Sequence, residues 1–92
     1  MPMIKRTITV TNPKGIHARP SAMLVKTASK FKSEIILTNN DITVSAKSVL
    51  GIMTLCAKTG TVLELETSGI DEKEAADAIE YVFTVRFPGE NI

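Results

Sequence analysis

The sequence has 92 residues, of which 43% are hydrophobic and 23% charged, and its 11 Lys and Arg against 10 Asp and Glu leave a net charge of +1. This length excludes a second hydrophobic core, so we expect a single soluble domain over residues 1–92, with its core from about 4 to 87. The balanced charge argues against a nucleic-acid-binding protein, and no apolar run approaches the roughly 20 residues of a membrane span.

Cysteine content and the N-terminus indicate the compartment. The chain has one cysteine, Cys56, which cannot form an internal disulfide and agrees with a reducing environment. The first residues lack the apolar segment and the small-residue cleavage site of a signal peptide. We therefore expect a cytoplasmic protein in which Cys56 is a small buried or half-buried side chain.

The first third of the chain predicts a strand followed by a helix. Residues 4–10, IKRTITV, alternate apolar and polar side chains, which is typical of a half-buried strand. A turn is expected at residues 12–15, where Asn, Pro and Gly gather. From 18 to 31 apolar residues recur at spacings of three and four, which predicts an amphipathic helix.

The middle of the chain predicts a hairpin and a short helix. The β-rich segments 34–38 and 42–46 flank Asn39-Asn40-Asp41, which is typical of a hairpin turn. The residues expected to face the core are Ile35, Leu37 and Val44. A short helix is expected from 48 to about 55, with Ser48 as its N-cap.

The last third predicts a strand and a helix. Residues 61–67, TVLELET, alternate again and indicate a strand with one wet face. The final helix is expected to open on a capping box of Asp71 and Glu74 and to end at Pro88-Gly89, leaving a frayed tail over 88–92. The order βαββαβα predicts an α+β fold, an open-faced β-sandwich with a four-stranded antiparallel sheet and three helices on one face.

The only histidine, His17, lies where the first helix is expected to begin. A helix start presents backbone N–H groups without intrahelical partners and the positive end of the helix dipole, which together bind phosphate. Arg19 adds a guanidinium suited to phosphate oxygens, and Gly15 permits a close backbone approach. A neutral imidazole is a nucleophile. The segment therefore predicts a histidine that carries a phosphoryl group. One histidine without a cluster of cysteines or carboxylates cannot form a metal site.

Two segments of the chain resemble the HPr family of phosphocarrier proteins. GIHARP followed by SAMLVKTASKF is similar to the active-site segment and first helix of the family, and AKSVLGIMTL is similar to its regulatory-serine region. The resemblance implies that His17 accepts phosphate on Nδ1 from phosphorylated Enzyme I and passes it to IIA domains of sugar permeases. It also implies that Arg19 neutralises phosphate charge, and that the backbone N–H groups of Ala18 and Arg19 bind the phosphate. No cofactor is implied, and the carrier is expected to act as a monomer without enzymatic turnover.

The resemblance also gives the region after Ser48 two interpretations. Ser48 is a natural N-cap, and in some relatives the matching serine is phosphorylated by an HPr kinase/phosphorylase, after which the carrier docks on a catabolite-control transcription factor. The apolar residues of this helix are too many for one buried face. Those expected either in the core or in a partner-docking patch are Val49, Leu50 and Met53. Lys26 and Lys47 are expected at the rim of such a patch, or as ordinary solvated lysines.

Other functions remain to be compared with the carrier. One alternative is a regulatory HPr paralogue, either in a nitrogen-related phosphorelay or as a co-regulator phosphorylated on Ser48. Because regulatory paralogues of the second kind lack the histidine, His17 argues against that as the sole role. A small RNA-binding α+β domain needs aromatic residues on its sheet and a basic surface. One Tyr, three Phe and a net charge of +1 supply neither.

Overall fold

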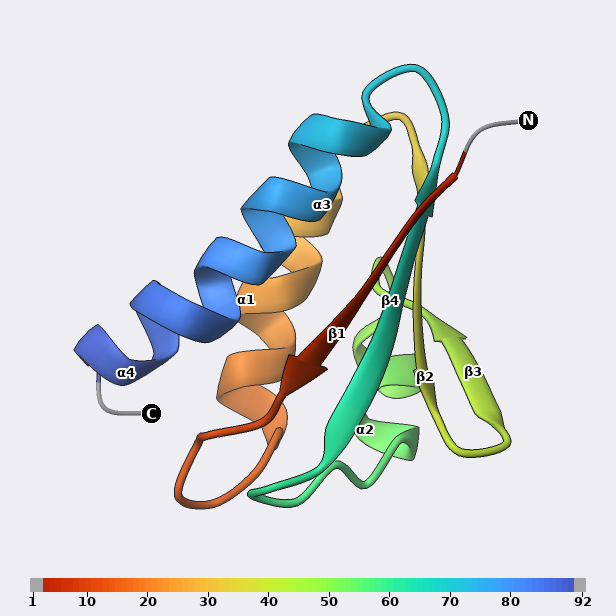
Figure 1. The fold of residues 1–92 in the computed structure, drawn as a ribbon. Helices are drawn as coiled ribbons and strands as arrows, with labels where there is room; N and C mark the ends of the chain where they lie inside the picture. The colour runs from red at the N-terminus through yellow and green to blue at the C-terminus, as the bar shows by residue number, and fades with distance from the viewer. Residues whose placement is uncertain (1–2, 91–92) are drawn as a thin grey trace.

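The computed structural model describes residues 3–90 and contains one four-stranded antiparallel sheet with its helices on one face (Figure 1). The strands are β1 (Ile4–Thr9), β2 (Glu34–Asn39), β3 (Ile42–Ser45) and β4 (Val62–Ser68), in the spatial order β1-β4-β2-β3. The helices that cover the sheet are α1 (Ala18–Ala28), α2 (Val49–Thr54) and α3 (Glu72–Tyr81). The predicted α+β open-faced sandwich is therefore confirmed.

The core lies between the sheet and the helices because each strand turns alternate side chains inward. Leu63 and Leu65 of β4 are fully buried, and the register sets Leu65 beside Leu37 of β2 and Leu63 beside Ile8 of β1. Leu24 of α1 is also fully buried against this layer. Burial of each such side chain contributes about 1.5–3 kcal/mol. The other face of the sheet carries mostly polar side chains and stays open to solvent.

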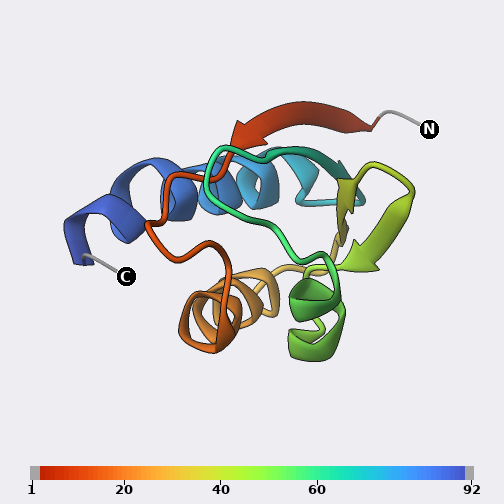
Figure 2. The ribbon, with the colours of Figure 1, turned by 90° about the horizontal axis from the view of Figure 1, so that it is seen from below.

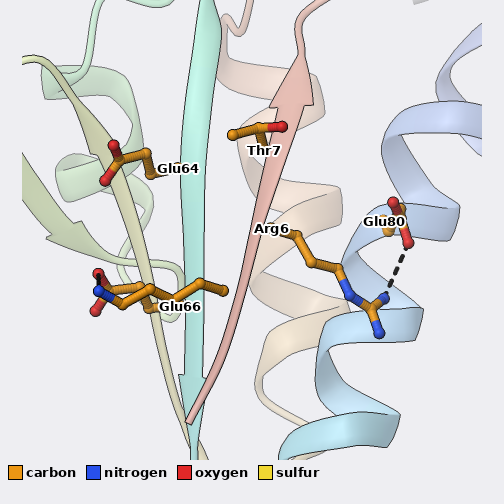
Figure 3. A pocket seen from close by; sticks show the side chains of 6 residues that line it. Arg6, Thr7, Glu64, Glu66 and Glu80 are labelled. Atoms are coloured by element: carbon orange, nitrogen blue, oxygen red, sulfur yellow. Dashed lines mark hydrogen bonds and ion pairs between the residues drawn. The ribbon is translucent and has the colours of Figure 1, made fainter.

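Charged residues tie the edge strand β1 to α3. The Arg6 guanidinium lies 2.8 Å from an oxygen of Asp77 and 2.9 Å from an oxygen of Glu80. Figure 3 shows Arg6 reaching towards Glu80, away from Glu64 and Glu66. The Lys73 ammonium and the Arg6 guanidinium lower the pKa of Asp77. A surface hollow is lined by the residues drawn in Figure 3, and two pairs of charges in it, Arg6 with Glu80 and Lys5 with Glu66, already interact within the fold.

Helix α1 ends earlier than its apolar spacing predicts. The α-helix stops at Ala28, not at Phe31. Ser29 N–H still bonds four residues back, to the Val25 carbonyl at 2.9 Å, but the next two reach back only three, from Lys30 to the Thr27 carbonyl and from Phe31 to the Ala28 carbonyl, each at 3.2 Å. Such bonds tighten the last turn into a 3₁₀ geometry. Phe31 still packs on the core, which explains why it fits the apolar stripe.

The C-terminal helix runs further than predicted. After α3 the chain continues as a π-helical segment, η1 (Val82–Arg86), and then as α4 (Phe87–Glu90), so the predicted stop at Pro88-Gly89 is wrong. In an α-helix the ring of Pro88 clashes with the carbonyl four residues earlier. Here Phe87 N–H bonds to the Val82 carbonyl, five residues back, and this wider turn makes room for the ring. Residues 91 and 92 of the predicted tail lie outside the described residues.

The start of α3 also differs from the prediction, because Asp71 and Glu74 do not form a capping box. Asp71 is the N-cap residue, yet its side chain makes no capping bond. Its carboxylate accepts hydrogen bonds from Ser33 Oγ, from Ser33 N–H at 2.9 Å and from Lys32 N–H at 3.0 Å. Glu72 instead accepts a bond from Gly69 N–H at 3.0 Å. Asp71 thus links the start of α3 to the start of β2.

The Asp71 contacts predict an acid-dependent stability. The Ser33 hydroxyl, with the backbone N–H groups, lowers the pKa of Asp71 from 3.8 to about 2. Between these values the unfolded chain binds a proton that the folded chain does not, so this stabilisation is complete above pH about 4 and is lost as pH falls towards 2. We expect Asp71→Asn to lower the urea midpoint at pH 7 and to flatten the loss of stability between pH 4 and 2. Urea titrations at a series of pH values measure both effects, with Asp41→Asn, at an exposed turn position, as the matched control. An unchanged acid limb in Asp71→Asn contradicts the assignment.

Candidate functional site

The site lies at one end of the sheet, where two loops distant in sequence come together. The loop from β1 to α1 and the loop from α2 to β4 lie at the same end of the molecule (Figure 1). Ile16 N–H donates to the Ala57 carbonyl at 2.9 Å, and Val10 N–H donates to the Thr61 carbonyl at 2.8 Å. The buried Asn12 adds a third connection, because its carbonyl accepts from the Thr59 hydroxyl. The two loops therefore hold the start of α1 in place.

Gly15 makes the close approach of these loops possible. Its φ is +70°, in the left-handed region, and a Cβ added there lies 2.5 Å from the Ala57 carbonyl oxygen. Only glycine meets both conditions without strain. The expectation that Gly15 permits a close backbone approach before the histidine is confirmed, and the partner it approaches is the backbone of Ala57.

His17 is the N-cap residue of α1. Its extended backbone (φ −93°, ψ −165°) turns the chain into the helix, and its carbonyl accepts Ser21 N–H at 3.0 Å and Ser21 Oγ at 2.8 Å. The imidazole itself makes no capping bond and is half-buried. The backbone of His17 thus supports the helix, while its ring is not used in the cap.

The first turn of α1 presents donors beside that ring. The N–H groups of Ala18 and Arg19 precede the first intrahelical bond, and Pro20 has no N–H. Ala18 and Arg19 are exposed, and the first turn contains no acidic residue to occupy the donors. The helix dipole adds a partial positive charge at the same place. The N–H groups of Ala18 and Arg19 therefore lie in the first turn of the helix that His17 begins, a position that favours an anion.

A shallow hollow of about 400 Å³ is lined in part by His17. Its lining includes Lys14, Cys56 and Lys58 besides the histidine. Sequence reasoning missed Lys58, because no spacing or motif connects it with a histidine 41 positions earlier; the antiparallel pairing of the loops places it there. Cys56 is exposed, so the prediction of a buried or half-buried side chain is wrong. Its backbone has φ +49° in the turn that ends α2, which directs the side chain outward rather than into the core.

Helix α2 is capped by Ser48 and carries both a buried and an exposed apolar surface. Ser48 Oγ accepts Gly51 N–H at 3.0 Å, which confirms the predicted N-cap. Ile52 is fully buried, whereas Val49, Leu50 and Met53 are 37%, 80% and 41% exposed. These three side chains therefore form an exposed apolar surface on α2, which we call the α2 patch. Exposed clusters of this kind mark docking surfaces more often than chance.

The two predicted rim lysines are placed differently. Lys26 is exposed in the last turn of α1. Lys47 donates from Nζ to the Phe31 carbonyl at 2.7 Å and so connects the start of α2 with the end of α1. Helix α2 also contacts α1 directly, so the two helices that carry these residues are neighbours. Among the described residues, no group of three or more His, Cys, Asp or Glu is arranged to hold a metal ion, and no helix has the length and apolarity to cross a membrane.

Comparison with known proteins agrees with this geometry. Residues 4–84 match a family model described as "PTS HPr component phosphorylation site". The chain is 51% identical over 77 residues to the phosphocarrier protein HPr of Neisseria meningitidis serogroup B, covering 84% of this chain and 86% of that one. It is 44% identical over 88 residues to that of Treponema pallidum, covering 96% and 100%. The crystal structure of HPr-C-His from Thermoanaerobacter tengcongensis superimposes with a TM-score of 0.88 at 41% identity, covering 92% of this chain and 96% of that one.

The Gly15 approach predicts a difference between two glycines. Gly60 also has a positive φ, +91°, but open space surrounds its missing Cβ. Gly60→Ala should therefore cost only the left-handed strain, about 1–2 kcal/mol, whereas Gly15→Ala adds a backbone collision and should cost about 3–4 kcal/mol. Urea denaturation measures both free energies of unfolding. Equal losses in the two variants contradict the tight packing of Gly15 on the Ala57 carbonyl.

Proposed function

Because the chain belongs to the HPr family of phosphocarrier proteins of the phosphoenolpyruvate:sugar phosphotransferase system, we propose that His17 accepts a phosphoryl group from phosphorylated Enzyme I and passes it to IIA domains of sugar permeases. The observation that carries the proposal is the position of His17 at the start of α1. There the ring is not used for capping and is adjacent to donors that no helix bond occupies.

The proposed transfer needs a nucleophile and positive charge. The lone pair of Nδ1, the nitrogen used in the family, forms the bond to phosphorus, and the bond from phosphorus to the donor breaks with its electrons going to the donor. Transfers of this kind depend mainly on position and on stabilisation of charge on the phosphoryl oxygens. The Ala18 and Arg19 N–H groups supply hydrogen bonds, and the Arg19 guanidinium supplies charge. Lys14 and Lys58 add positive charge from the side of the hollow.

The openness of the site fits a carrier rather than an enzyme. The His17 ring is half-buried, so a phosphate on it stays accessible to solvent and to partners. The protein therefore holds the phosphate with few contacts. Each partner enzyme then supplies the rest of the catalytic groups. Because these contacts are few, the carrier can pass the phosphate on to a IIA domain or back to Enzyme I.

The surroundings of His17 support docking of acidic and apolar partners. The α2 patch offers exposed apolar area, and Met53 adapts to different surfaces. Lys26 and Lys47 lie on neighbouring elements and add cations. Enzyme I and the IIA domains are proposed to share this surface in turn.

Phosphoryl transfer from phosphoenolpyruvate with catalytic Enzyme I tests the carrier role. Wild-type protein should gain one acid-labile phosphoryl group by mass spectrometry, and His17→Ala should gain none. Arg19→Gln should be charged about 10- to 100-fold more slowly, since a charge-assisted hydrogen bond contributes about 1.5–3 kcal/mol. Phosphate that remains in His17→Ala, or a wild type that no Enzyme I charges, overturns the proposal.

Regulation through Ser48 is a second proposal, carried by the exposure of its hydroxyl next to the α2 patch. An HPr kinase/phosphorylase would replace a neutral acceptor with a phosphate dianion. The new charge beside Leu50 and Met53 weakens docking of acidic partners and creates a site for a catabolite-control transcription factor. The nitrogen-related paralogue role is distinguished by which Enzyme I charges the chain.

Kinase treatment tests the Ser48 proposal separately from the carrier. Wild-type protein with HPr kinase and ATP should gain an acid-stable phosphate, and Ser48→Ala should gain none while still accepting phosphate on His17. Ser48→Ala also loses the cap to Gly51 N–H, which costs about 1 kcal/mol. Ser48→Thr keeps both the cap and a hydroxyl and is the matched control for stability. A kinase that leaves Ser48 unmodified under conditions where it modifies another HPr contradicts the proposal.

A further inference from the structure

The two loops that form the site contain no acidic residue, although the chain has 10 Asp and Glu. The sequence has none over residues 1–33 or 42–63, and both loops fall within these ranges. The cations that the loops themselves carry are Lys14 and Lys58. Within the described residues 3–90, the side chain of neither lysine has a hydrogen-bond or ion-pair partner. Their positive charge is therefore not compensated by the part of the fold that the structure describes.

Backbone contacts fix where both lysines lie. Gly15 N–H donates to the Asn12 carbonyl at 2.9 Å and closes a turn that contains Lys14. Thr61 N–H donates to the Lys58 carbonyl at 3.0 Å, and the Lys58 Cα lies 3.1 Å from a Cβ built on Gly15. Figure 2 looks onto this end of the molecule and shows the two loops side by side. The contacts that hold the start of α1 thus also place the two lysines.

Both lysines line the same hollow as His17. The remaining residues that line it carry no charge and are Pro13, Ile16, Cys56 and Ala57. Lys14 and Lys58 are exposed, and the histidine is half-buried. The hollow therefore offers two positive charges and no negative one to a group attached to the ring.

A phosphoryl group on the ring brings the charge that these lysines lack. Such a group carries about two negative charges near neutral pH and several acceptor oxygens. A lysine ammonium is a compact cation with three donors on a flexible stem, so it reaches phosphate oxygens without a fixed geometry. The donors at the start of α1 come from one loop only. Lys58 adds a cation from the second loop, which the hydrogen bond from Ile16 N–H to the Ala57 carbonyl holds in place.

We infer that Lys58, together with Lys14, binds the phosphoryl group carried by His17 and so stabilises the phosphorylated form of this chain. The inference rests on the proposed carrier function. Arg19 and the N–H groups of α1 contact the phosphoryl oxygens from the helix, and the two lysines contact them from the loops. The lysines thereby determine how readily the chain gives up its phosphoryl group.

The equilibrium constant for charging tests the inference, because it does not depend on how well Enzyme I docks. Catalytic Enzyme I brings each protein to equilibrium with phosphoenolpyruvate and excess pyruvate, and mass spectrometry gives the phosphorylated fraction. Lys58→Gln and Lys14→Gln should each lower the constant about two- to fivefold at low salt. The difference should shrink at about 300 mM salt, where exposed charges are screened. Lys58→Arg keeps the charge and should stay within about twofold of wild type.

Lys32→Gln is the matched control for these variants. Lys32 is exposed and lies beyond the far end of α1, where its backbone N–H bonds to Asp71. The substitution removes the same charge from the chain but leaves the hollow unchanged. Its equilibrium constant should equal that of the wild type. Thermal melts establish that each variant is folded.

Cys56 gives a second, independent measurement of the same hollow. Its exposed side chain lines the hollow, and the chain has no other cysteine. A phosphoryl group bound by Lys58 places negative charge beside the thiol and disfavours the thiolate, which is the reactive form. Phosphorylation of His17 should therefore slow the alkylation of Cys56 by iodoacetamide severalfold in the wild type. The slowing should be smaller in the Lys14→Gln/Lys58→Gln double variant.

The outcomes separate this inference from the carrier function. If the wild type is charged on His17 but the Lys58 and Lys14 variants keep its equilibrium constant, the inference alone is overturned. A change confined to the KM for Enzyme I also overturns it and assigns the lysines to docking. An equal drop in the Lys32 variant overturns it as well, because the effect then reflects net charge, as does a Cys56 alkylation rate that phosphorylation leaves unchanged. A wild type that accepts no phosphate from any Enzyme I overturns the carrier function, and the inference falls with it.

Discussion

The hydrogen bond from Ile16 N–H to the Ala57 carbonyl is the contact on which the site depends. Gly15 reaches that carbonyl with a positive φ, and the two loops are then too close to admit any other residue. His17 follows at once and begins α1. Because the backbone of one loop holds the backbone of another, the ring of the histidine takes no part in its own positioning. A side chain that carries a phosphoryl group, as we propose for His17, is best supported in this way.

The same constraint explains the asymmetry of charge around the histidine. Arg19 lies in the first turn of α1, and Lys14 and Lys58 line the shallow hollow that His17 also lines. Carboxylates are used in the opposite region, where Asp77 and Glu80 hold β1 to α3 through Arg6 and where Asp71 links α3 to β2. The acidic residues anchor the sheet, and the loop end that holds His17 stays basic. A nearly neutral chain can therefore attract anions to that end.

Whether a feature of the structure could be predicted from the sequence depends on how far apart in the chain the interacting residues are. The strands, the Ser48 cap and the grouping of His17, Ala18 and Arg19 depend on residues close in the chain, where periodicity and end signals apply. Asp71 was misassigned because its partners, Lys32 and Ser33, come from a segment nearly forty residues earlier. Lys58 and the exposure of Cys56 depend on loop packing, and local pattern carries no information about that. Pro88 predicts a stop that the structure does not have, because the π-type bond upstream of it has no sequence signature.

The C-terminal helix shows how such an undetected feature changes the surface. A single bond from Phe87 N–H to the Val82 carbonyl adds a residue to one turn and accommodates a proline that would otherwise end the helix. Phe83 and Phe87 then both reach the core, which fixes the segment. Packing of two aromatic rings in the core therefore fixes where the exposed residues of this segment, Thr84, Val85 and Arg86, lie on the surface.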